Sequence, residues 1–135
     1  KRSGVFKMGL FRRKFKKDIH SPLWKSFYYA FNGIIEALKE ERNLCIHFTA
    51  MILVIIFGLY FDITKSEWMT CVILFGLVIS LELVNTAVEA TIDLCCPDIH
   101  PKAKLAKDTA AGAVLVAAIA AMIEGLVIFL PYFIS

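Results

Sequence analysis

The run ISLELVNTAVEATIDL, residues 79–94, places a stripe of polar side chains inside a long apolar stretch. The polar side chains are Glu82, Asn85, Glu89 and Asp93. At 100° per residue on an α-helix they fall within an arc of about 60°, so they share one face. Carboxylates on one face repel each other and are costly to remove from water. The stripe therefore favours a bound divalent cation that carries a polyphosphate.

The composition around this stripe is that of a membrane protein. Hydrophobic residues make up 59% of the 135 residues, and the mean hydropathy of +0.68 lies well above that of soluble domains. The four cysteines follow no regular spacing, so we expect no disulfide framework. Residues 1–42 hold eleven of the fifteen Lys and Arg residues. Beside apolar spans, this basic arm indicates contact with anionic lipid and not with nucleic acid.

The hydrophobic pattern predicts an all-α membrane protein with an N-terminal amphipathic surface helix and three transmembrane helices. A basic segment, residues 1–20, precedes a single membrane domain, residues 21–135. Within the basic segment, Met8 is a candidate natural start, and the residues before it would then derive from an expression tag. The expected elements of the domain are a surface helix at residues 22–42 and spans at about residues 43–61, 67–94 and 106–131. We expect Pro131 to close the last span.

The distribution of basic residues sets the expected topology. The N-terminal arm and the loop after the second span carry fourteen of the fifteen cations, whereas the link after the first span carries only Lys65. Cytoplasmic segments are enriched in Lys and Arg, so we expect the N-terminus and the polar stripe on the cytoplasmic side. Three short spans enclose little interior. We therefore expect a homo-oligomer that shields the stripe, with the site between helices and between subunits.

Two runs carry a resemblance to a known family. The run E-L-V-N-T-A-V-E-A-T-I-D-L at 82–94, a His-containing loop and the run A-K-D-T-A-A-G-A-V-L at 106–115 resemble the small prokaryotic diacylglycerol kinases. The resemblance covers about residues 22–131 and includes A-L-K-E-E-R-N before the first span. It implies a homotrimeric, three-span kinase of the bacterial cytoplasmic membrane that uses ATP with Mg²⁺ to phosphorylate a lipid alcohol.

The choice of lipid also comes from the resemblance. The runs A-L-K-E-E-R-N…I-H and A-A-G-A-V-L-V-A-A-I are most similar to the Gram-positive branch of the family, the undecaprenol kinases. We therefore expect undecaprenol as the substrate, with diacylglycerol as the alternative. No feature of a pocket that can be derived from the sequence distinguishes a polyprenol from a glyceride.

The resemblance also implies roles for individual residues. Glu82 matches the catalytic carboxylate, which would bind the lipid substrate and accept the proton of its hydroxyl group. Glu89 and Glu41 match the metal ligands, although the adjacent Glu40 takes this role if the alignment shifts by one residue. The residues expected to contact ATP are Tyr29, Glu41, Asn85, Glu89, Asp93, Asp98, His100, Lys107 and Asp108.

Several residues have simpler interpretations or stay outside this assignment. Without the resemblance, His100 is typical of a solvated loop histidine and Tyr29 of an interfacial aromatic residue. We interpret His47 as a neutral histidine at the membrane interface and Glu124 as interfacial or paired. Cys45 departs from the family pattern, because many relatives have a basic residue there.

Two other classes of function compete with a kinase. A small proton-coupled transporter also carries carboxylates within the membrane. A transporter needs polar groups accessible from both faces, but here the acidic residues cluster on one side and Glu124 is the only one deep in the other half. A non-enzymatic membrane subunit would use the same acidic residues to contact a partner protein. Binding of MgATP by the chain alone would exclude that second alternative.

Overall fold

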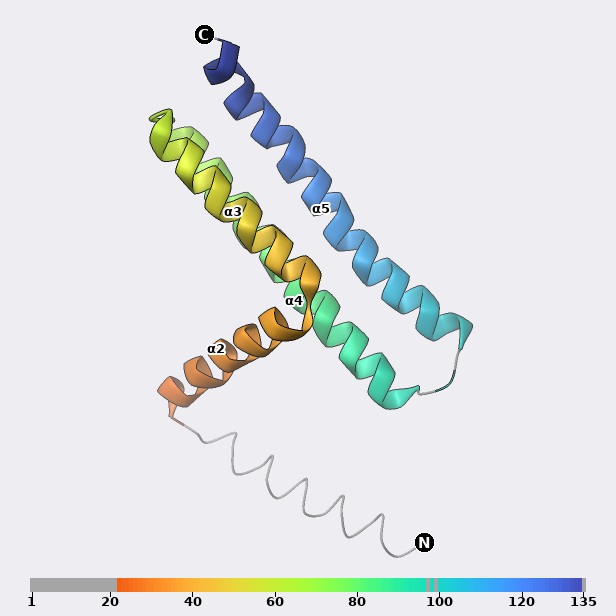
Figure 1. Ribbon diagram of the computed structural model, residues 1–135. Coiled ribbons are helices and arrows are strands. Elements are labelled where there is room, and N and C mark those ends of the chain that lie inside the picture. The colour runs from red at the N-terminus through yellow and green to blue at the C-terminus, as the bar shows by residue number, and fades with distance from the viewer. Residues whose placement is uncertain (1–21, 97, 99, 135) are drawn as a thin grey trace, which may run out of the picture. The chain divides into compact units, whose positions relative to one another are not determined.

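The computed structural model describes residues 22–96, 98 and 100–134, and within these ranges it contains helices and no strand (Figure 1). The helices are α2 (Leu23–Glu40), α3 (Arg42–Tyr60), α4 (Lys65–Cys95) and α5 (Pro101–Ile134). Three of them, α3, α4 and α5, are long and apolar enough to cross a membrane. The prediction of an all-α membrane protein is therefore confirmed. The expected basic segment and its candidate start, Met8, lie outside the described residues.

The chain divides into two compact units, with the boundary between Glu36 and Ala37. The described part of the first unit is most of α2, which is strongly amphipathic. Its large exposed side chains are Leu23, Trp24, Phe27, Tyr28, Tyr29, Phe31 and Ile35. The Lys25 ammonium group lies 5.7 Å from the ring centre of Trp24. Such a mixture of aromatic and cationic side chains is typical of a helix at a membrane surface.

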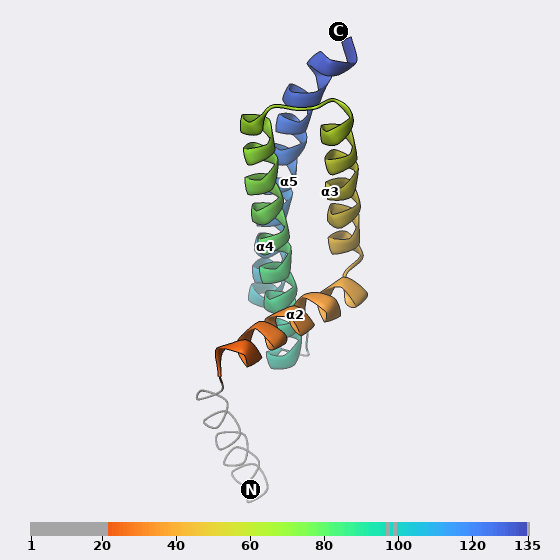
Figure 2. The ribbon, with the colours of Figure 1, turned by 90° about the vertical axis from the view of Figure 1, so that its left-hand side faces the viewer.

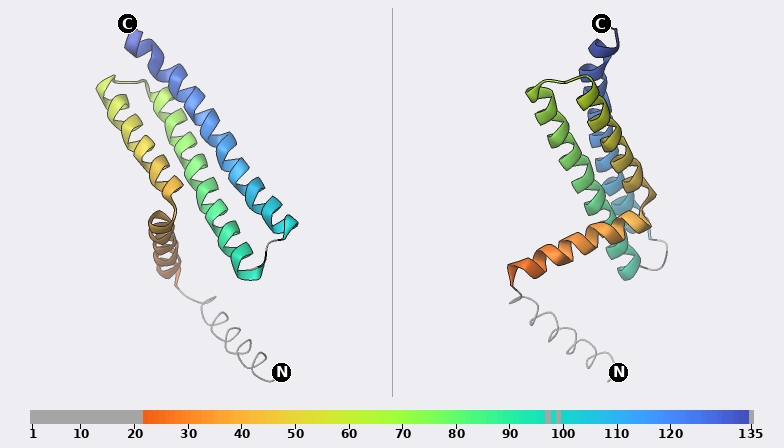
Figure 3. Two further views of the ribbon diagram at one scale, coloured as in Figure 1. Left: turned by 45° about the vertical axis from the view of Figure 1, so that its right-hand side comes forward. Right: turned by 60° about the vertical axis from the view of Figure 1, so that its left-hand side comes forward.

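Helix α4 is central in the second unit. It packs against α3 and, over a more extensive contact, against α5. Figures 2 and 3 show the three helices side by side, with the chain reversing direction at each connection. Thr64 caps the start of α4, because its side chain accepts the Glu67 N–H while the Glu67 carboxylate accepts the Thr64 N–H at 2.7 Å. This capping box satisfies backbone donors that the first turn of a helix leaves unpaired.

The helix limits differ from the predicted spans, most clearly in α5. This helix begins at Pro101 and not at residue 106, and it continues past Pro131 to Ile134, so the expectation that Pro131 closes the span is wrong. Proline suits the first helical position, which needs no N–H donor, and transmembrane helices tolerate an internal proline. Lys107 and Asp108 consequently lie more than one turn inside α5 and not at its start.

The α3–α4 connection and the C-terminal part of α5 form a small hydrophobic core. Ile63, Cys71 and Ile128 are buried there, and the Tyr132 hydroxyl donates to Glu67 Oε2 at 3.0 Å. Gly58 of α3 approaches Trp68 so closely that an added Cβ would lie 2.8 Å from two ring atoms. This contact positions α3 against α4 near their connection.

We expect Gly58→Ala to destabilise the helix bundle by about 1–3 kcal/mol relative to Gly76→Ala, because only the first substitution overpacks a contact. An added Cβ at Gly76 meets no atom within 4 Å. Both variants gain the same helix propensity, so the comparison isolates the clash. The measurement is the midpoint of unfolding as the SDS fraction rises in mixed micelles. Equal midpoints for the two variants would contradict the close approach of Gly58 to Trp68.

Candidate functional site

The polar side chains buried among the described residues are Glu82 and Asn85, which are 2% and 6% exposed. Both lie on the face of α4 that the stripe predicts. Glu82 Oε1 and Asn85 Oδ1 are buried without a hydrogen-bond partner. A buried acceptor that stays unpaired costs about 1–3 kcal/mol. These two atoms are therefore available to a ligand, a water molecule or a neighbouring donor.

Glu82 and Asn85 open into a pocket of about 500 Å³ formed by all three long helices, which we call the carboxylate pocket. Its lining residues are Asn43 and His47 from α3, Glu82 and Asn85 from α4, and Asp108, Ala111, Gly112, Val114, Leu115 and Ala118 from α5. The small residues of α5 leave space opposite the two polar side chains of α4. The cavity thus combines an apolar wall with a buried acid.

The stripe residues of α4 interact with one another and with the start of α3. Asn85 Nδ2 donates to Glu89 Oε1 at 2.9 Å. Glu41 and Glu89 both lie close enough to Glu82 to interact with it electrostatically. Glu41 is half-buried at the junction of α2 and α3, whereas the neighbouring Glu40 is exposed. This difference favours Glu41 over Glu40 as the residue that belongs to the site.

The carboxylates do not form a preorganised metal cage. Among the described residues, no group of three or more His, Cys, Asp or Glu side chains converges closely enough to hold a metal ion. Magnesium commonly takes only one or two protein carboxylates and completes its coordination with phosphate oxygens and water. Glu41 and Glu89 fit that pattern of donors.

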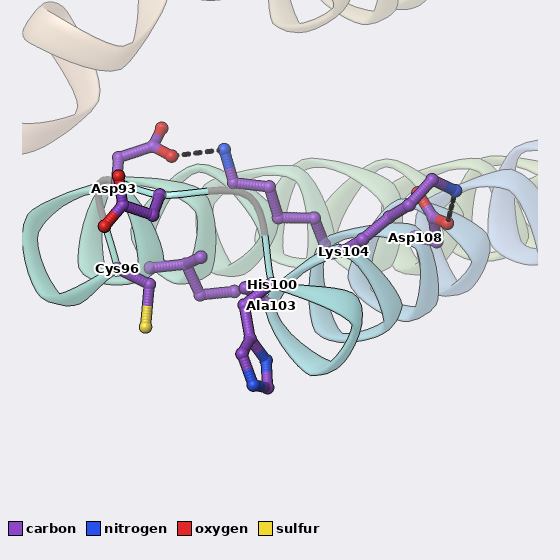
Figure 4. A pocket seen from close by; sticks show the side chains of 9 residues that line it. Asp93, Cys96, His100, Ala103, Lys104 and Asp108 are labelled. Atoms are coloured by element: carbon purple, nitrogen blue, oxygen red, sulfur yellow. Dashed lines mark hydrogen bonds and ion pairs between the residues drawn. The ribbon is translucent and has the colours of Figure 1, made fainter.

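A second pocket, of about 280 Å³, lies where the α4–α5 connection meets both helices, and we call it the loop pocket. Its lining residues are Ile92, Asp93, Cys96, Asp98, His100, Ala103, Lys104, Lys107 and Asp108. The Lys107 ammonium group pairs with Asp93 at 2.5 Å, and Lys104 pairs with Asp108 at 2.6 Å (Figure 4). Ion pairs at such accessible positions contribute little stability, so a polyphosphate can displace the acidic partners.

The two pockets share Asp108, and their linings include most of the predicted residues of the second unit. Glu41 and Glu89 line neither pocket, but both interact electrostatically with Glu82. His100 Nδ1 accepts the Lys102 N–H at 3.2 Å, which gives this histidine a structural partner at the start of α5. Asp98 is exposed in the connection. Tyr29 lies in the first unit, and its contact with ATP stays a prediction.

The structure also brings a residue to the site that the sequence analysis placed outside it. His47 Nε2 lies 3.8 Å from Glu82 Oε1. Asn43 and His47 are four residues apart in α3, and both line the carboxylate pocket. A polar pair at this spacing in an otherwise apolar span faces one side of a helix. This spacing is a sequence signal that Asn43 and His47 share a polar face of α3, although it does not indicate which residues that face meets.

The structure changes the reason for expecting an oligomer. The prediction assumed that other subunits must shield the stripe, but α3 and α5 of the same chain already bury Glu82 and Asn85. Glu89 remains half-buried and Asp93 exposed. Few residues of the three spans are buried within one chain. The oligomeric state and the expected position of the site between subunits stay predictions.

These features define a class of protein: a helical membrane protein with a buried acid in one pocket and two lysines lining an adjoining pocket. Residues 28–129 match the sequence model of the family described as prokaryotic diacylglycerol kinase. The undecaprenol kinase of Bacillus subtilis is 48% identical over 108 residues, which are 80% of this chain and 88% of that protein.

Two diacylglycerol kinases are more distant relatives. The protein from Synechocystis is 38% identical over 128 residues, covering 89% of this chain and 73% of that protein. The protein from Escherichia coli K12 is 26% identical over 109 residues, covering 81% of this chain and 89% of that protein. The chain therefore belongs to the prokaryotic diacylglycerol kinase family. It is a membrane lipid kinase that transfers a phosphoryl group from ATP, as the resemblance predicted.

Proposed function

We propose that this kinase phosphorylates undecaprenol and produces undecaprenyl phosphate. Support comes from the 48% identity to a protein named undecaprenol kinase over most of both chains. Diacylglycerol, which would give phosphatidic acid, is the alternative because more distant relatives are named diacylglycerol kinases. The observation that carries the catalytic assignment is the buried Glu82 carboxylate in a pocket bounded by all three long helices.

Glu82 is the proposed proton acceptor and the contact for the lipid hydroxyl group. As the hydroxyl oxygen attacks the γ-phosphorus of ATP, its proton passes to the Glu82 carboxylate, and the bond from the γ-phosphorus to the ADP oxygen breaks. A proton acceptor must be within hydrogen-bond reach of the reacting group. The apolar wall of the carboxylate pocket suits a hydroxyl group that arrives on a hydrocarbon chain.

Glu41 and Glu89 are the proposed ligands of Mg²⁺. Both are carboxylates near Glu82, and the hydrogen bond from Asn85 orients Glu89. When bound, Mg²⁺ supplies positive charge that offsets the charge of the phosphate oxygens. Asn85 Oδ1 has no partner among the described residues, so this amide can also orient a donor group in the pocket.

The loop pocket is the proposed position of much of the nucleotide. Lys107 would leave Asp93 to bind a phosphate oxygen, while Asp108, which lines both pockets, would stay near the reacting groups or the ribose. Asp93, Asp98 and His100 surround the same space. Tyr29 is proposed to contact ATP from the surface helix, in line with the family resemblance.

We further propose a homotrimer with the site on the cytoplasmic side of the membrane. The charge distribution supports this orientation, because fourteen of the fifteen Lys and Arg residues flank that end of the predicted spans. The family resemblance supports the trimer. Mass determination in native micelles, together with labelling of the exposed Cys95 and Cys96 in sealed vesicles, tests both proposals.

The central experiment is transfer of a radiolabelled γ-phosphate from MgATP by purified protein in mixed micelles. Undecaprenol and diacylglycerol are offered separately at equal mole fraction and then in competition. We expect label mainly in undecaprenyl phosphate, because the chain shares more sequence with the relative named for that lipid than with those named for diacylglycerol. The inactive blank is Glu82→Gln.

The outcomes separate the alternatives. Preference for diacylglycerol in competition would replace the proposed substrate while leaving the kinase class unchanged. Transfer to neither lipid by folded protein would contradict both substrates. Proton flux in vesicles without phosphoryl transfer would favour the transporter alternative.

A further inference from the structure

The Glu82 carboxylate has one oxygen that lacks a partner on the side facing α3. That oxygen, Oε1, is buried without a hydrogen bond, and it is also the atom 3.8 Å from His47 Nε2. The Glu82 side chain is 3% exposed and the His47 side chain 23%. An N–H···O hydrogen bond is about 2.9–3.0 Å long, so the two atoms must approach each other further to form one.

Few other groups near the pocket can donate a hydrogen bond to Glu82 Oε1. The side chains facing this carboxylate or its pocket from the three helices are Asn43 and His47 on α3, with Glu41 before it, Asn85 and Glu89 on α4, and Asp108 on α5. The Asn85 amide already donates to Glu89, and the other acids carry the wrong charge. The nearby ammonium groups, Lys104 and Lys107, are paired with Asp108 and Asp93. Asn43 also has a donor amide but is exposed, whereas the His47 imidazole lies 3.8 Å from Oε1. The imidazole is therefore the donor best placed for a hydrogen bond to Glu82.

His47 also lines a third pocket, of about 270 Å³, which is mainly apolar. Its other lining residues are Ala50, Met51, Val54, Phe75, Val78, Ile79, Ala118, Ala121, Met122 and Gly125. The apolar pocket and the carboxylate pocket share only His47 and Ala118. His47 is thus the polar side chain at the boundary between hydrocarbon-like surroundings and the Glu82 carboxylate.

We propose that His47 is a positioning residue for Glu82: its Nε2–H binds Glu82 Oε1 and leaves Oε2 to accept the proton of the lipid hydroxyl group. This inference rests on the proposed role of Glu82 as proton acceptor. A carboxylate whose one oxygen is held loses rotational freedom, so its other oxygen keeps the orientation that proton transfer requires. The donor also stabilises the buried negative charge before the reaction.

The test replaces His47 with residues that keep or remove the donor. We expect His47→Leu to lower kcat for lipid phosphorylation by about 10–100-fold, as the loss of an orienting partner typically does. The KM for MgATP should change little, because the contact involves the proton acceptor and not the nucleotide. His47→Gln should recover most of the lost rate, because its terminal amide can place an N–H near the position of Nε2. His47→Asn, with a shorter side chain, should not.

Met51→Leu is the matched control, since Met51 lines the same apolar pocket one turn along α3 and the exchange conserves volume. It should keep the wild-type kcat. The inference is overturned if His47→Leu turns over at the wild-type rate, if His47→Gln is as slow as His47→Leu, or if the KM for MgATP rises in step with the loss of kcat. Should His47→Leu fail to fold, His47→Gln and His47→Asn are compared instead. A faster kcat in His47→Gln supports the inference, and equal kcat values in the two variants overturn it.

Glu82→Gln, assayed in parallel, separates this inference from the proposed function. A wild-type rate in Glu82→Gln would remove the proton acceptor itself. An inactive Glu82→Gln together with a fully active His47→Leu would leave the proposed function intact and overturn only the role of His47.

Discussion

Glu82→Gln is expected to lower the rate of phosphoryl transfer by about 100–10,000-fold, the usual contribution of a general base. The amide keeps the shape of the buried side chain but cannot accept the hydroxyl proton. Since Glu82 lies in the carboxylate pocket and not in the loop pocket, binding of MgATP should persist. The measurements are single-turnover transfer of labelled γ-phosphate and calorimetric titration with MgATP.

The matched control for this prediction is Glu124→Gln. Glu124 is a partly buried carboxylate in a different transmembrane helix, and it lines neither the carboxylate pocket nor the loop pocket. This variant should turn over like the wild type, which shows that loss of an intramembrane charge is not itself inactivating. A wild-type rate in Glu82→Gln would contradict the role of Glu82 as the base. Loss of MgATP binding in parallel with the loss of rate would instead indicate that Glu82 belongs to the nucleotide site.

Glu89→Ala is expected to weaken binding of MgATP by about 100-fold, because losing a metal ligand costs at least as much as losing a residue that orients one. Glu89 accepts a hydrogen bond from Asn85 and, like Glu41, interacts electrostatically with Glu82, so its removal leaves one proposed carboxylate ligand. Raising the Mg²⁺ concentration should restore part of the affinity, because the defect lies in holding the metal. Calorimetric titrations with MgATP at several Mg²⁺ concentrations measure this effect.

The comparison of Glu41→Ala with Glu40→Ala completes the metal prediction. Glu41→Ala should weaken MgATP binding as Glu89→Ala does, whereas Glu40→Ala should bind like the wild type because Glu40 is exposed. Chelation of divalent cations with EDTA should abolish phosphoryl transfer in the wild type. Unchanged MgATP affinity in Glu89→Ala would remove that residue from the proposed metal site. If only Glu40→Ala weakened MgATP binding, and not Glu41→Ala, Glu40 would replace Glu41 as the proposed ligand.

Several features of the site could be predicted because they depend on local geometry. The backbone hydrogen bonds of a helix set 100° per residue, so Glu82, Asn85 and Glu89 had to share one face once the run was helical. Asn85 and Glu89 are four residues apart, and the hydrogen bond between them follows from that spacing. The apolar stretches predicted three spans for the same local reason, while the family resemblance predicted the kinase class.

Other features depend on how the helices rotate against one another, and the pattern of one helix does not carry that information. The sequence did not indicate that His47 faces Glu82 or that Lys107 pairs with Asp93. It also did not indicate that the chain's own α3 and α5 bury Glu82 and Asn85.

By itself, then, the sequence determined the helical elements, the polar face of α4 and the membrane class, because these follow from local periodicity and hydropathy. The tertiary structure alone decided which side chains meet across helices. Those contacts depend on packing between residues far apart in the chain, such as His47 with Glu82. For that reason, the donor opposite the proposed base became visible only when α3 and α4 were placed side by side.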